Sequence, residues 1–288
     1  MTQMKILATT DGSPRSYAVI PHAARLALAV DGELLLLRVL SPELDCGDHE
    51  AVRTVAERWS GELAARLAEV KASGHGVVEV CRHGEKIHEG ILRVVSEQGI
   101  DIVALSSRGS GFLRHAVLGS VALRLLGKTP IPMLVAGERV ANPTGQGKYH
   151  IVVTTDGSEE ALRAVEAVIP LSMHESVEVT LLRIHVPHLG DRGDAVEAAA
   201  AAEALDQLRE RFPNPHNVRT VLRTIVRLGG VDTAIVSAAT EVRASAIAIS
   251  THGHSAKYHV FMGSTALGVL RQSDLPLLLV RSAPVATS

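Results

Sequence analysis

Two short motifs each occur twice in this chain of 288 residues, once in each half. Thr-Thr-Asp-Gly-Ser at residues 9–13 returns at residues 154–158. A glycine followed after nine residues by Gly-Ser begins at Gly109 and returns at Gly253. The first motif repeats after 145 residues and the second after 144. Self-similarity at a nearly constant period indicates two copies of one structural unit, each offering the same site.

We therefore expect one domain over residues 1–138, a linker over residues 139–148 and a second domain over residues 149–288. Each domain would be close to the commonest domain size, about 100–150 residues. The linker contains Asn-Pro-Thr-Gly-Gln-Gly at residues 142–147, a composition typical of a connecting segment. A single large α/β domain is the alternative, but it would not need the same loop chemistry at a fixed period.

Composition and the order of elements predict an α/β fold in both halves. Hydrophobic residues make up 46% of the chain and aromatic residues 2%, so the core must consist of Val, Leu, Ile and Ala, which suits buried parallel strands. Strands alternate with helices, which predicts two doubly wound domains with right-handed crossovers. Strands are expected at residues 5–10, 33–40, 77–81, 101–106 and 131–135, and then at 149–155, 177–185, 218–227, 244–250 and 276–281. Helices are expected at residues 50–71, 85–97 and 120–126, and then at 159–171, 195–211, 231–240 and 264–272. Ser13 is expected to be the N-cap of the first helix, with Pro14 in its first turn.

Charge and composition argue against several classes of partner. The formal net charge of −2 and the scarcity of aromatic side chains give no support for nucleic-acid binding. No apolar run approaches the ~18 residues needed to span a bilayer, and residues 1–5 show no secretory pattern. Two cysteines, Cys46 and Cys81, are too few for a disulfide framework. We expect a cytoplasmic protein with no nucleic-acid or membrane partner.

The repeated motifs point to one edge of each sheet. Asp11 and Asp156 end the first strand of their halves, and the glycine motifs follow the fourth strand and lead into a helix. In a doubly wound sheet these strand ends can flank the point where the strand order reverses, and ligands bind in that crevice. The two motifs of each half are therefore expected to form one site.

The chemistry at this edge suits a phosphate group. Gly109 and Gly253 can adopt backbone angles closed to other residues and let amide groups approach an anion. The Gly-Ser pairs at residues 119–120 and 263–264 are expected at helix starts, where unpaired N–H groups and the helix dipole favour negative charge. Either motif alone is weak evidence, because Asp-Gly-Ser is also an ordinary turn and Gly-Ser an ordinary helix start.

Taken together, these residues resemble the signature G-x2-G-x9-G-[S/T] of the universal stress protein family. The segments that carry the resemblance are residues 106–109 with 119–120, residues 250–253 with 263–264, the opening strand and turn at 5–13, and the closing strands at 130–135 and 275–280. The resemblance covers nearly the whole chain and is that of a tandem, two-domain member.

The resemblance implies a five-stranded parallel sheet of order 3-2-1-4-5 flanked by helices in each half, and an ATP site in each. Magnesium would accompany the ATP phosphates. The residues implied to contact the nucleotide are Asp11, Val39, Ser106, Gly109, Gly119 and Ser120 in the first half, and Asp156, Ile184, Ser250, Gly253, Gly263 and Ser264 in the second. The aspartates would meet adenine or ribose, Val39 and Ile184 would contact adenine, and the glycines and the serines at 120 and 264 would hold ribose and phosphates.

One departure from the signature occurs in both halves. Ser106 and Ser250 stand where the family has its first glycine, and each adds a side chain close to the expected nucleotide, where it could instead hydrogen-bond the ribose. We expect a stress-response module that binds ATP at one or both sites and signals through nucleotide-dependent protein contacts. Two alternatives stay open: a nucleotide-free interaction scaffold of the same fold, and a slow ATPase or phosphotransfer enzyme.

The sequence offers little support for catalysis or for a resident metal. It has no P-loop lysine pattern, nucleophile elbow or convincing acid–base pair, so a binding module is favoured over an enzyme. The histidine pairs at residues 252–254 and 185–188 lack further ligands at a spacing typical of zinc. In the family, domains dimerise through the fifth strand, which implies pairing of residues 131–135 with residues 277–281 inside one chain and leaves a homodimer open.

Overall fold

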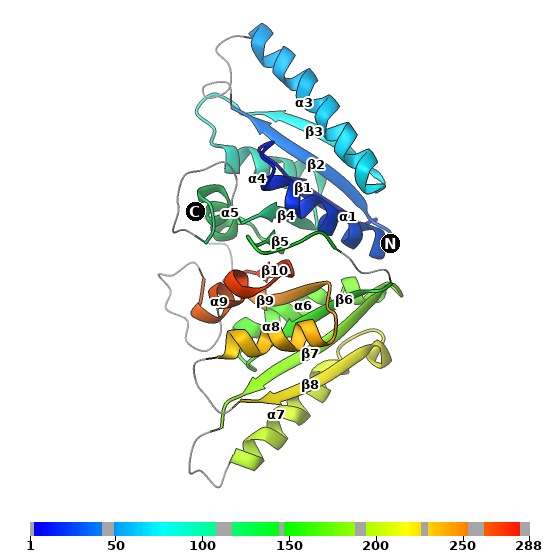
Figure 1. The fold of residues 1–288 in the computed structure, drawn as a ribbon, viewed down its shortest axis with the longest axis vertical. Helices are drawn as coiled ribbons and strands as arrows, with labels where there is room; N and C mark the ends of the chain where they lie inside the picture. Colours follow the sequence, from blue (N-terminus) through cyan, green and yellow to red (C-terminus); the bar gives the residue numbers. More distant parts are fainter. Residues whose placement is uncertain are drawn as a thin grey trace. The chain divides into compact units, whose positions relative to one another are not determined.

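The computed structural model describes residues 3–41, 49–107, 117–143, 147–187, 194–225, 230–252 and 262–282. The chain divides into two compact units, Met1–Pro143 and Thr144–Ser288 (Figure 1). The division falls inside the stretch that the sequence predicts to be a linker. Val140 in this stretch is buried, and the Ala141 carbonyl lies 2.8 Å from His22 Nε2, so its first residues pack on the first unit.

In the described part of the first unit, five parallel strands form a sheet of order β3-β2-β1-β4-β5. The strands are β1 (Lys5–Thr9), β2 (Glu33–Leu40), β3 (Gly74–Val80), β4 (Ile102–Ser106) and β5 (Met133–Ala136). The helices are α1 (Ile20–Ala29), α3 (His49–Val70), α4 (Ile87–Gln98) and α5 (Ser120–Lys128), with a 3-10 turn, η1 (Ser16–Val19), before α1. The predicted order 3-2-1-4-5 is confirmed.

The described part of the second unit repeats this topology, with parallel strands in the order β8-β7-β6-β9-β10. The strands are β6 (Tyr149–Thr154), β7 (Val177–His185), β8 (Val218–Thr224), β9 (Ala246–Ser250) and β10 (Leu277–Val280). The helices are α6 (Glu159–Val168), α7 (Asp194–Arg209), α8 (Val231–Glu241) and α9 (Ser264–Gln272), with 3-10 turns η2 (Leu171–Met173) and η3 (Pro215–Asn217).

Helices cover both faces of the sheet, which explains why its strands are apolar without alternation. In the first unit α1 contacts α3, while α4 contacts α5, so each face is covered by one pair of helices (Figure 1). The four consecutive leucines at residues 34–37 of β2 are therefore all buried. Burying one leucine side chain stabilises a fold by about 1.5–3 kcal/mol, so these strands carry much of the core. None of the helices in the described ranges is both long and apolar enough to cross a membrane.

The start of the first helix differs from the prediction. The α-helix begins at Ile20 with Val19 as its N-cap, and not at Ser13 and Pro14. Ser13 Oγ instead accepts a bond from the Ser16 amide at 3.3 Å, at the start of η1. Ser106 Oγ of β4 donates to the Ser16 carbonyl at 3.2 Å. This carbonyl is thus held by a neighbouring strand, and the chain enters the helix through a tighter turn.

The third strand begins three residues earlier than predicted, at Gly74 and not at Val77. Gly74 pairs with Leu34, and a Cβ at Gly74 would overlap the Leu34 carbonyl. Gly74 and Gly76 are therefore part of the strand, and at residue 74 only glycine fits against β2.

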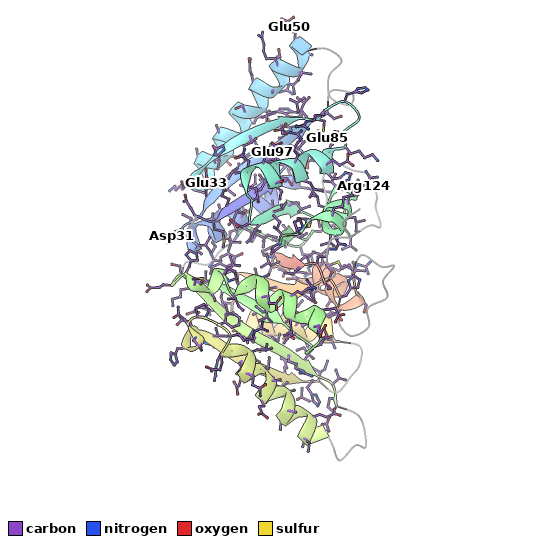
Figure 2. The ribbon with its side chains drawn as sticks, turned by 180° about the vertical axis from the view of Figure 1, so that it is seen from behind. Asp31, Glu33, Glu50, Glu85, Glu97 and Arg124 are labelled. Atoms are coloured by element: carbon purple, nitrogen blue, oxygen red, sulfur yellow. The ribbon has the colours of Figure 1, made fainter. Side chains whose placement is uncertain are left out.

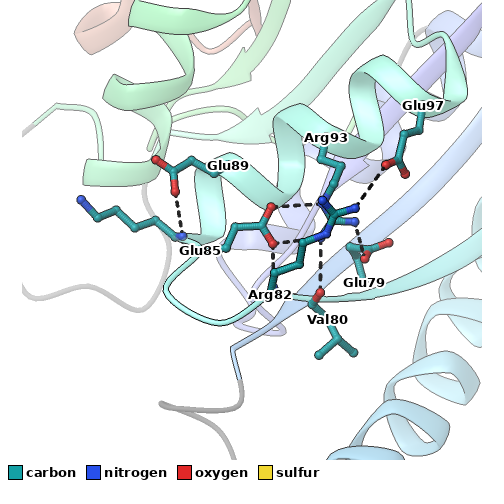
Figure 3. A network of polar contacts seen from close by, with 8 residues as sticks. Glu79, Val80, Arg82, Glu85, Glu89, Arg93 and Glu97 are labelled. Atoms are coloured by element: carbon teal, nitrogen blue, oxygen red, sulfur yellow. Dashed lines mark hydrogen bonds and ion pairs between the residues drawn. The ribbon is translucent and has the colours of Figure 1, made fainter.

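A network of ion pairs fastens α4 to β3 in the first unit (Figure 3). Arg93 lies 2.7 Å from Glu79 Oε1 of β3 and 2.9 Å from Glu85 Oε2, and its Nη2 donates to the Val80 carbonyl. The Arg93 side chain is 15% exposed and that of Glu85 14% exposed. The bonds from Arg93 lower the pKa of Glu85 from its usual 4.5 to about 2.

We predict that Arg93→Met destabilises the protein by about 1–3 kcal/mol at neutral pH, because it leaves two half-buried carboxylates without their charged donor. A carboxyl group whose pKa is lowered by folding stabilises the fold at pH values above its unfolded-state pKa. This contribution is lost as the pH falls through its folded-state pKa. The difference in unfolding free energy between wild type and variant should therefore shrink as the pH falls from 4.5 to about 2. Urea unfolding at several pH values measures it.

Arg53→Met is the matched control, because Arg53 is 74% exposed and lies 3.8 Å from Glu57 on the surface of α3. It should change the unfolding free energy by less than about 0.5 kcal/mol. Equal, pH-independent effects of the two substitutions would contradict the role assigned to the network.

Candidate functional site

The topology opens a crevice at one edge of each sheet. The first and fourth strands of each unit are neighbours, β1 beside β4 and β6 beside β9. In the first unit the chain leaves β1 toward α1 on one face and β4 toward α5 on the other. The strand order reverses between these two strands, so their carboxyl ends diverge and leave room for a ligand.

In the second unit a pocket of about 300 Å³ occupies this position. Its lining includes every described residue that the sequence places at the nucleotide, namely Asp156, Ile184, Ser250, Gly263 and Ser264. These residues come from the ends of three strands and the start of α9. A pocket of this size is at the lower end of the range for small-molecule sites, about 300–1,000 Å³.

The apolar wall of this pocket contains residues that sequence reasoning missed. Leu182 of β7, Ile249 of β9, and Val231 and Ile235 of α8 line it beside Ile184. They give a flat apolar ligand a surface on which to lie, opposite the polar side formed by Asp156 and the start of α9. Nothing in their sequence separates them from ordinary core residues, and Val231 and Ile235 reach the crevice only because α8 packs against the sheet.

The Asp-Gly-Ser turns hold their carboxylates by the same amide bond in both units, and the second unit adds a hydroxyl bond. Asp156 Oδ1 accepts the Ser158 amide at 3.0 Å and the Ser158 hydroxyl at 2.6 Å, and Asp11 Oδ1 accepts the Ser13 amide at 2.9 Å. The glycine between them has a φ of 84° at Gly12 and 87° at Gly157, in the left-handed region that favours glycine. The turn thereby fixes an exposed carboxylate at the mouth of the crevice.

An arginine that sequence reasoning missed packs against the glycine of each turn. The guanidinium of Arg38 lies 2.5–2.6 Å from the point where a Cβ on Gly12 would stand, and Arg183 Nη1 lies 2.9 Å from the equivalent point on Gly157. Arg38 also stacks on Trp59 of α3, with Cζ 3.5 Å from the ring centroid, and pairs with Glu62 at 3.0 Å. In the first unit the turn therefore packs on Arg38, which in turn packs on Trp59 of α3.

The fourth-strand motifs begin helices, as expected. Gly119 is the N-cap of α5 and Gly263 the N-cap of α9, and neither supplies a side-chain oxygen to the first N–H groups. Each glycine amide donates back to the loop at 2.7 Å, Gly119 to the Ser107 carbonyl and Gly263 to that of Thr251. The helix starts are thus held in place with their first-turn N–H groups directed at the crevice, an arrangement that favours an anion.

The serines that replace the signature's first glycine make bonds within the protein. Ser250 Oγ donates to the His252 carbonyl at 2.5 Å, and Ser106 Oγ donates to the Ser16 carbonyl. Both hydroxyls therefore stabilise the edges of the crevice, and Ser250 also lines the pocket.

In the first unit the predicted site residues occupy equivalent positions. Asp11 follows β1, Ser106 ends β4, and Gly119 and Ser120 begin α5. Val39 of β2 faces α4, with Cγ1 3.3 Å from the point where a Cβ on Gly90 would stand. The predicted residues Gly109 and Gly253 lie outside the described residues, as does Cys46, while Cys81 is buried.

Within the described ranges, no group of three or more His, Cys, Asp and Glu side chains is placed to hold a metal ion. The described residues thus provide carboxylate, hydroxyl and amide groups around an apolar pocket.

Two copies of a doubly wound α/β domain, each with a glycine-capped helix start at its switch point, define the class of this protein. A model of the universal stress protein family matches residues 3–137 and residues 149–281. The chain therefore belongs to the universal stress protein family and carries its domain twice, which confirms the resemblance found in the sequence.

The chain is similar to universal stress proteins that match nearly its whole length and to one that matches about half of it. A universal stress protein of Mycolicibacterium smegmatis is 23% identical over 305 residues, covering 97% of this chain and 98% of its own. Universal stress protein YxiE of Bacillus subtilis is 27% identical over 144 residues, which is 46% of this chain and 97% of its own. A solved universal stress protein from Archaeoglobus fulgidus superposes with a TM-score of 0.63 at 19% identity, covering 96% of both chains.

We predict that Gly12→Ala destabilises the protein by about 1–3 kcal/mol, because alanine is strained at this φ and its methyl group would displace Arg38. Gly61→Ala is the matched control in the exposed middle of α3, where no atom lies within 4 Å of the new methyl group. It should stabilise the protein by about 0.5–1 kcal/mol. Urea unfolding measures both, and a neutral Gly12→Ala would show that the turn is not held by its arginine.

Proposed function

We propose that both units bind an adenine nucleotide, with ATP as the expected ligand, and that the protein is a cytoplasmic stress-response module whose protein contacts depend on nucleotide occupancy. The observation that carries this proposal is the pocket of the second unit, where residues chosen from sequence alone line one cavity. The same motif, turn and helix start in the first unit support a second site there.

The division of the pocket into an apolar and a polar side fits a nucleotide. Leu182, Ile184 and Ile249 offer a surface to the base, and the fixed carboxylate of Asp156 can accept hydrogen bonds from an amino or hydroxyl group. Phosphates would lie at Gly263 and Ser264, on the N–H groups of α9. Magnesium would be held mainly by the phosphates and water, since it often needs few protein ligands.

We propose a binding module and not an enzyme. Among the described lining residues, Asp156 and His252 are the ones with a carboxyl or imidazole side chain. Asp156 Oδ1 is engaged by its own turn, which suits a fixed acceptor better than a general base. The N–H groups in the first turn of α9 can hold a phosphate of the bound nucleotide, but they supply no nucleophile.

We predict that wild-type protein binds two ATP per chain in the presence of magnesium. Gly119→Val and Gly263→Val should each bind one, and the double variant none. Both glycines have a φ that valine tolerates, −67° and −66°, and a new Cβ would meet loop carbonyls at no less than 3.3 Å. The valine side chain would instead fill the approach of the phosphates.

Isothermal titration calorimetry gives the stoichiometry, with circular dichroism to show that each variant is folded. Failure of folded wild-type protein to bind ATP at millimolar concentration would refute the proposal and leave a nucleotide-free scaffold. Measurable turnover abolished by Asp11→Asn or Asp156→Asn would show an enzyme instead.

We also predict that ATP binding in the first unit changes the fluorescence of Trp59, the only tryptophan of the chain. Trp59 stacks on Arg38, which packs under the turn that carries Asp11. The signal should persist in Gly263→Val and vanish in Gly119→Val. A signal that follows the second site instead would contradict this assignment.

A further inference from the structure

The two sites differ in the charges that surround the anion-binding helix. This helix packs against its neighbour in both units, α5 against α4 and α9 against α8. We call these contacts the α4–α5 seam and the α8–α9 seam. Arg124 and Gly268 are each the fifth residue of their helix, and His88 and Asp232 are each the second residue of the neighbouring helix. The two seams therefore carry different residues at the same places.

The α8–α9 seam holds a carboxylate beside the pocket. A Cβ on Gly268 would overlap Asp232 Oδ2, so this glycine makes room for the aspartate. Gln272 Nε2 donates to Asp232 Oδ2 at 2.6 Å, which fixes the carboxylate at the seam. Val231, the residue before Asp232, lines the pocket. The second site thus has a carboxylate one residue from its wall, and Arg271 in the last turn of α9 is the basic residue of that helix.

The α4–α5 seam carries positive charge at the matching positions. Arg124 stands in place of Gly268, Lys128 in place of Gln272, and Lys86 in place of Gly230, and all three are exposed. Among the described residues of this seam, the nearby carboxylate is Glu89, which lies 3.7 Å from Lys128 Nζ. Arg124 and Glu85 lie toward the same edge of the sheet, opposite Asp31 and Glu33 (Figure 2).

His88 does not supply the charge that Asp232 supplies in the other unit. Burial lowers the pKa of His88; Glu89 raises it, and the charges of Lys128, Arg124 and Lys86 lower it further. A neutral histidine therefore stands where the second unit has a carboxylate. The positive charge of the α4–α5 seam comes from Lys86, Arg124 and Lys128.

The turns at the first strand differ in the same direction. Arg15 follows Asp11 by four residues, and at the same distance Glu160 follows Asp156. Glu159 adds a second acid where the first unit has Pro14, and Arg163 is the one cation on α6. The first crevice therefore has a basic residue beside its turn, and the second has two acids.

These charges are placed to act on a ligand's phosphates. Side chains of a helix lean toward its N-terminus, so Arg124 covers the turn that begins at Ser120. That turn is about 6 Å long, shorter than the ~8 Å over which charges act in physiological salt. Each added phosphate makes a nucleotide more anionic, so it is attracted more strongly to the first site and repelled more strongly by the second.

We propose that the two sites differ in their preference among adenine nucleotides: the first favours a polyphosphate, and the second binds a monophosphate at least as tightly as a polyphosphate. This inference rests on the proposed adenine-nucleotide sites and names the preferred ligand class of each. One chain would then respond to the ratio of the two forms, since its two units favour different ones.

Single-site proteins test the proposal directly. Gly263→Val leaves the first site and Gly119→Val the second, and each is titrated with ATP, ADP and AMP by calorimetry. At the first site ATP should bind at least about tenfold more tightly than AMP, and this ratio should fall as salt is raised. At the second site AMP should bind at least as tightly as ATP.

Substitutions that remove single charges identify the residues responsible for the preference of each site. In the Gly263→Val background, Arg124→Gln with Lys128→Gln should weaken ATP binding about three- to tenfold and leave AMP binding within about twofold. In the Gly119→Val background, Asp232→Asn, which keeps an acceptor for Gln272, should tighten ATP binding about two- to fivefold. Arg53→Gln on α3 is the control and should change neither ratio. Circular dichroism shows that each variant is folded.

The failures of the two proposals are distinguishable. The inference would be overturned if the ratio of ATP affinity to AMP affinity were equal in the two single-site proteins, or if the substitutions did not change it. Neither result would refute the nucleotide sites themselves. A second site that binds no adenine nucleotide at all would also overturn it. Absence of binding at both sites would refute the proposed function itself.

Discussion

The parallel pairing of the first strand with both of its neighbours is the constraint on which each unit depends. β1 lies between β2 and β4, and β6 lies between β7 and β9. All strands of a parallel sheet end at the same edge, and the helices that follow the first and fourth strands must leave on opposite faces to cover the core. The crevice is thus a consequence of topology, and the residues that line it are whatever the chain places at those strand ends.

Rigid local structure converts this crevice into a site. The turn after the first strand is fixed by bonds to its own aspartate and by an arginine that packs under its glycine. The helix after the fourth strand is fixed by a glycine amide that bonds back to the loop. A carboxylate and a set of helix N–H groups are thereby held on opposite sides of one opening. Preorganised groups of this kind bind without first being ordered, which favours affinity.

The two units preserve this framework while their surroundings differ. Both retain the left-handed glycine, the arginine beneath it and the glycine at the helix start. The seam beside the helix that follows the fourth strand has His88 and Arg124 in the first unit, and Asp232 and Gly268 at the same places in the second. Residues that hold the turn and the helix start are thus shared, and the charged residues of the seam are where the copies diverge.

The sequence by itself determined the repeat, the strands of both sheets, the helix starts that follow the fourth strands and five of the residues that line the described pocket. It did so because these features have local causes: consecutive leucines need cover on both faces, and Gly-Ser after a strand begins a helix. Tertiary structure alone decided the packing of Trp59 on Arg38 and of Arg38 under Gly12, the part of the apolar wall contributed by α8, and the bond from Ser106 to the turn before α1. Each of these joins residues far apart in the chain, and no local pattern records which distant side chain will pack against which turn.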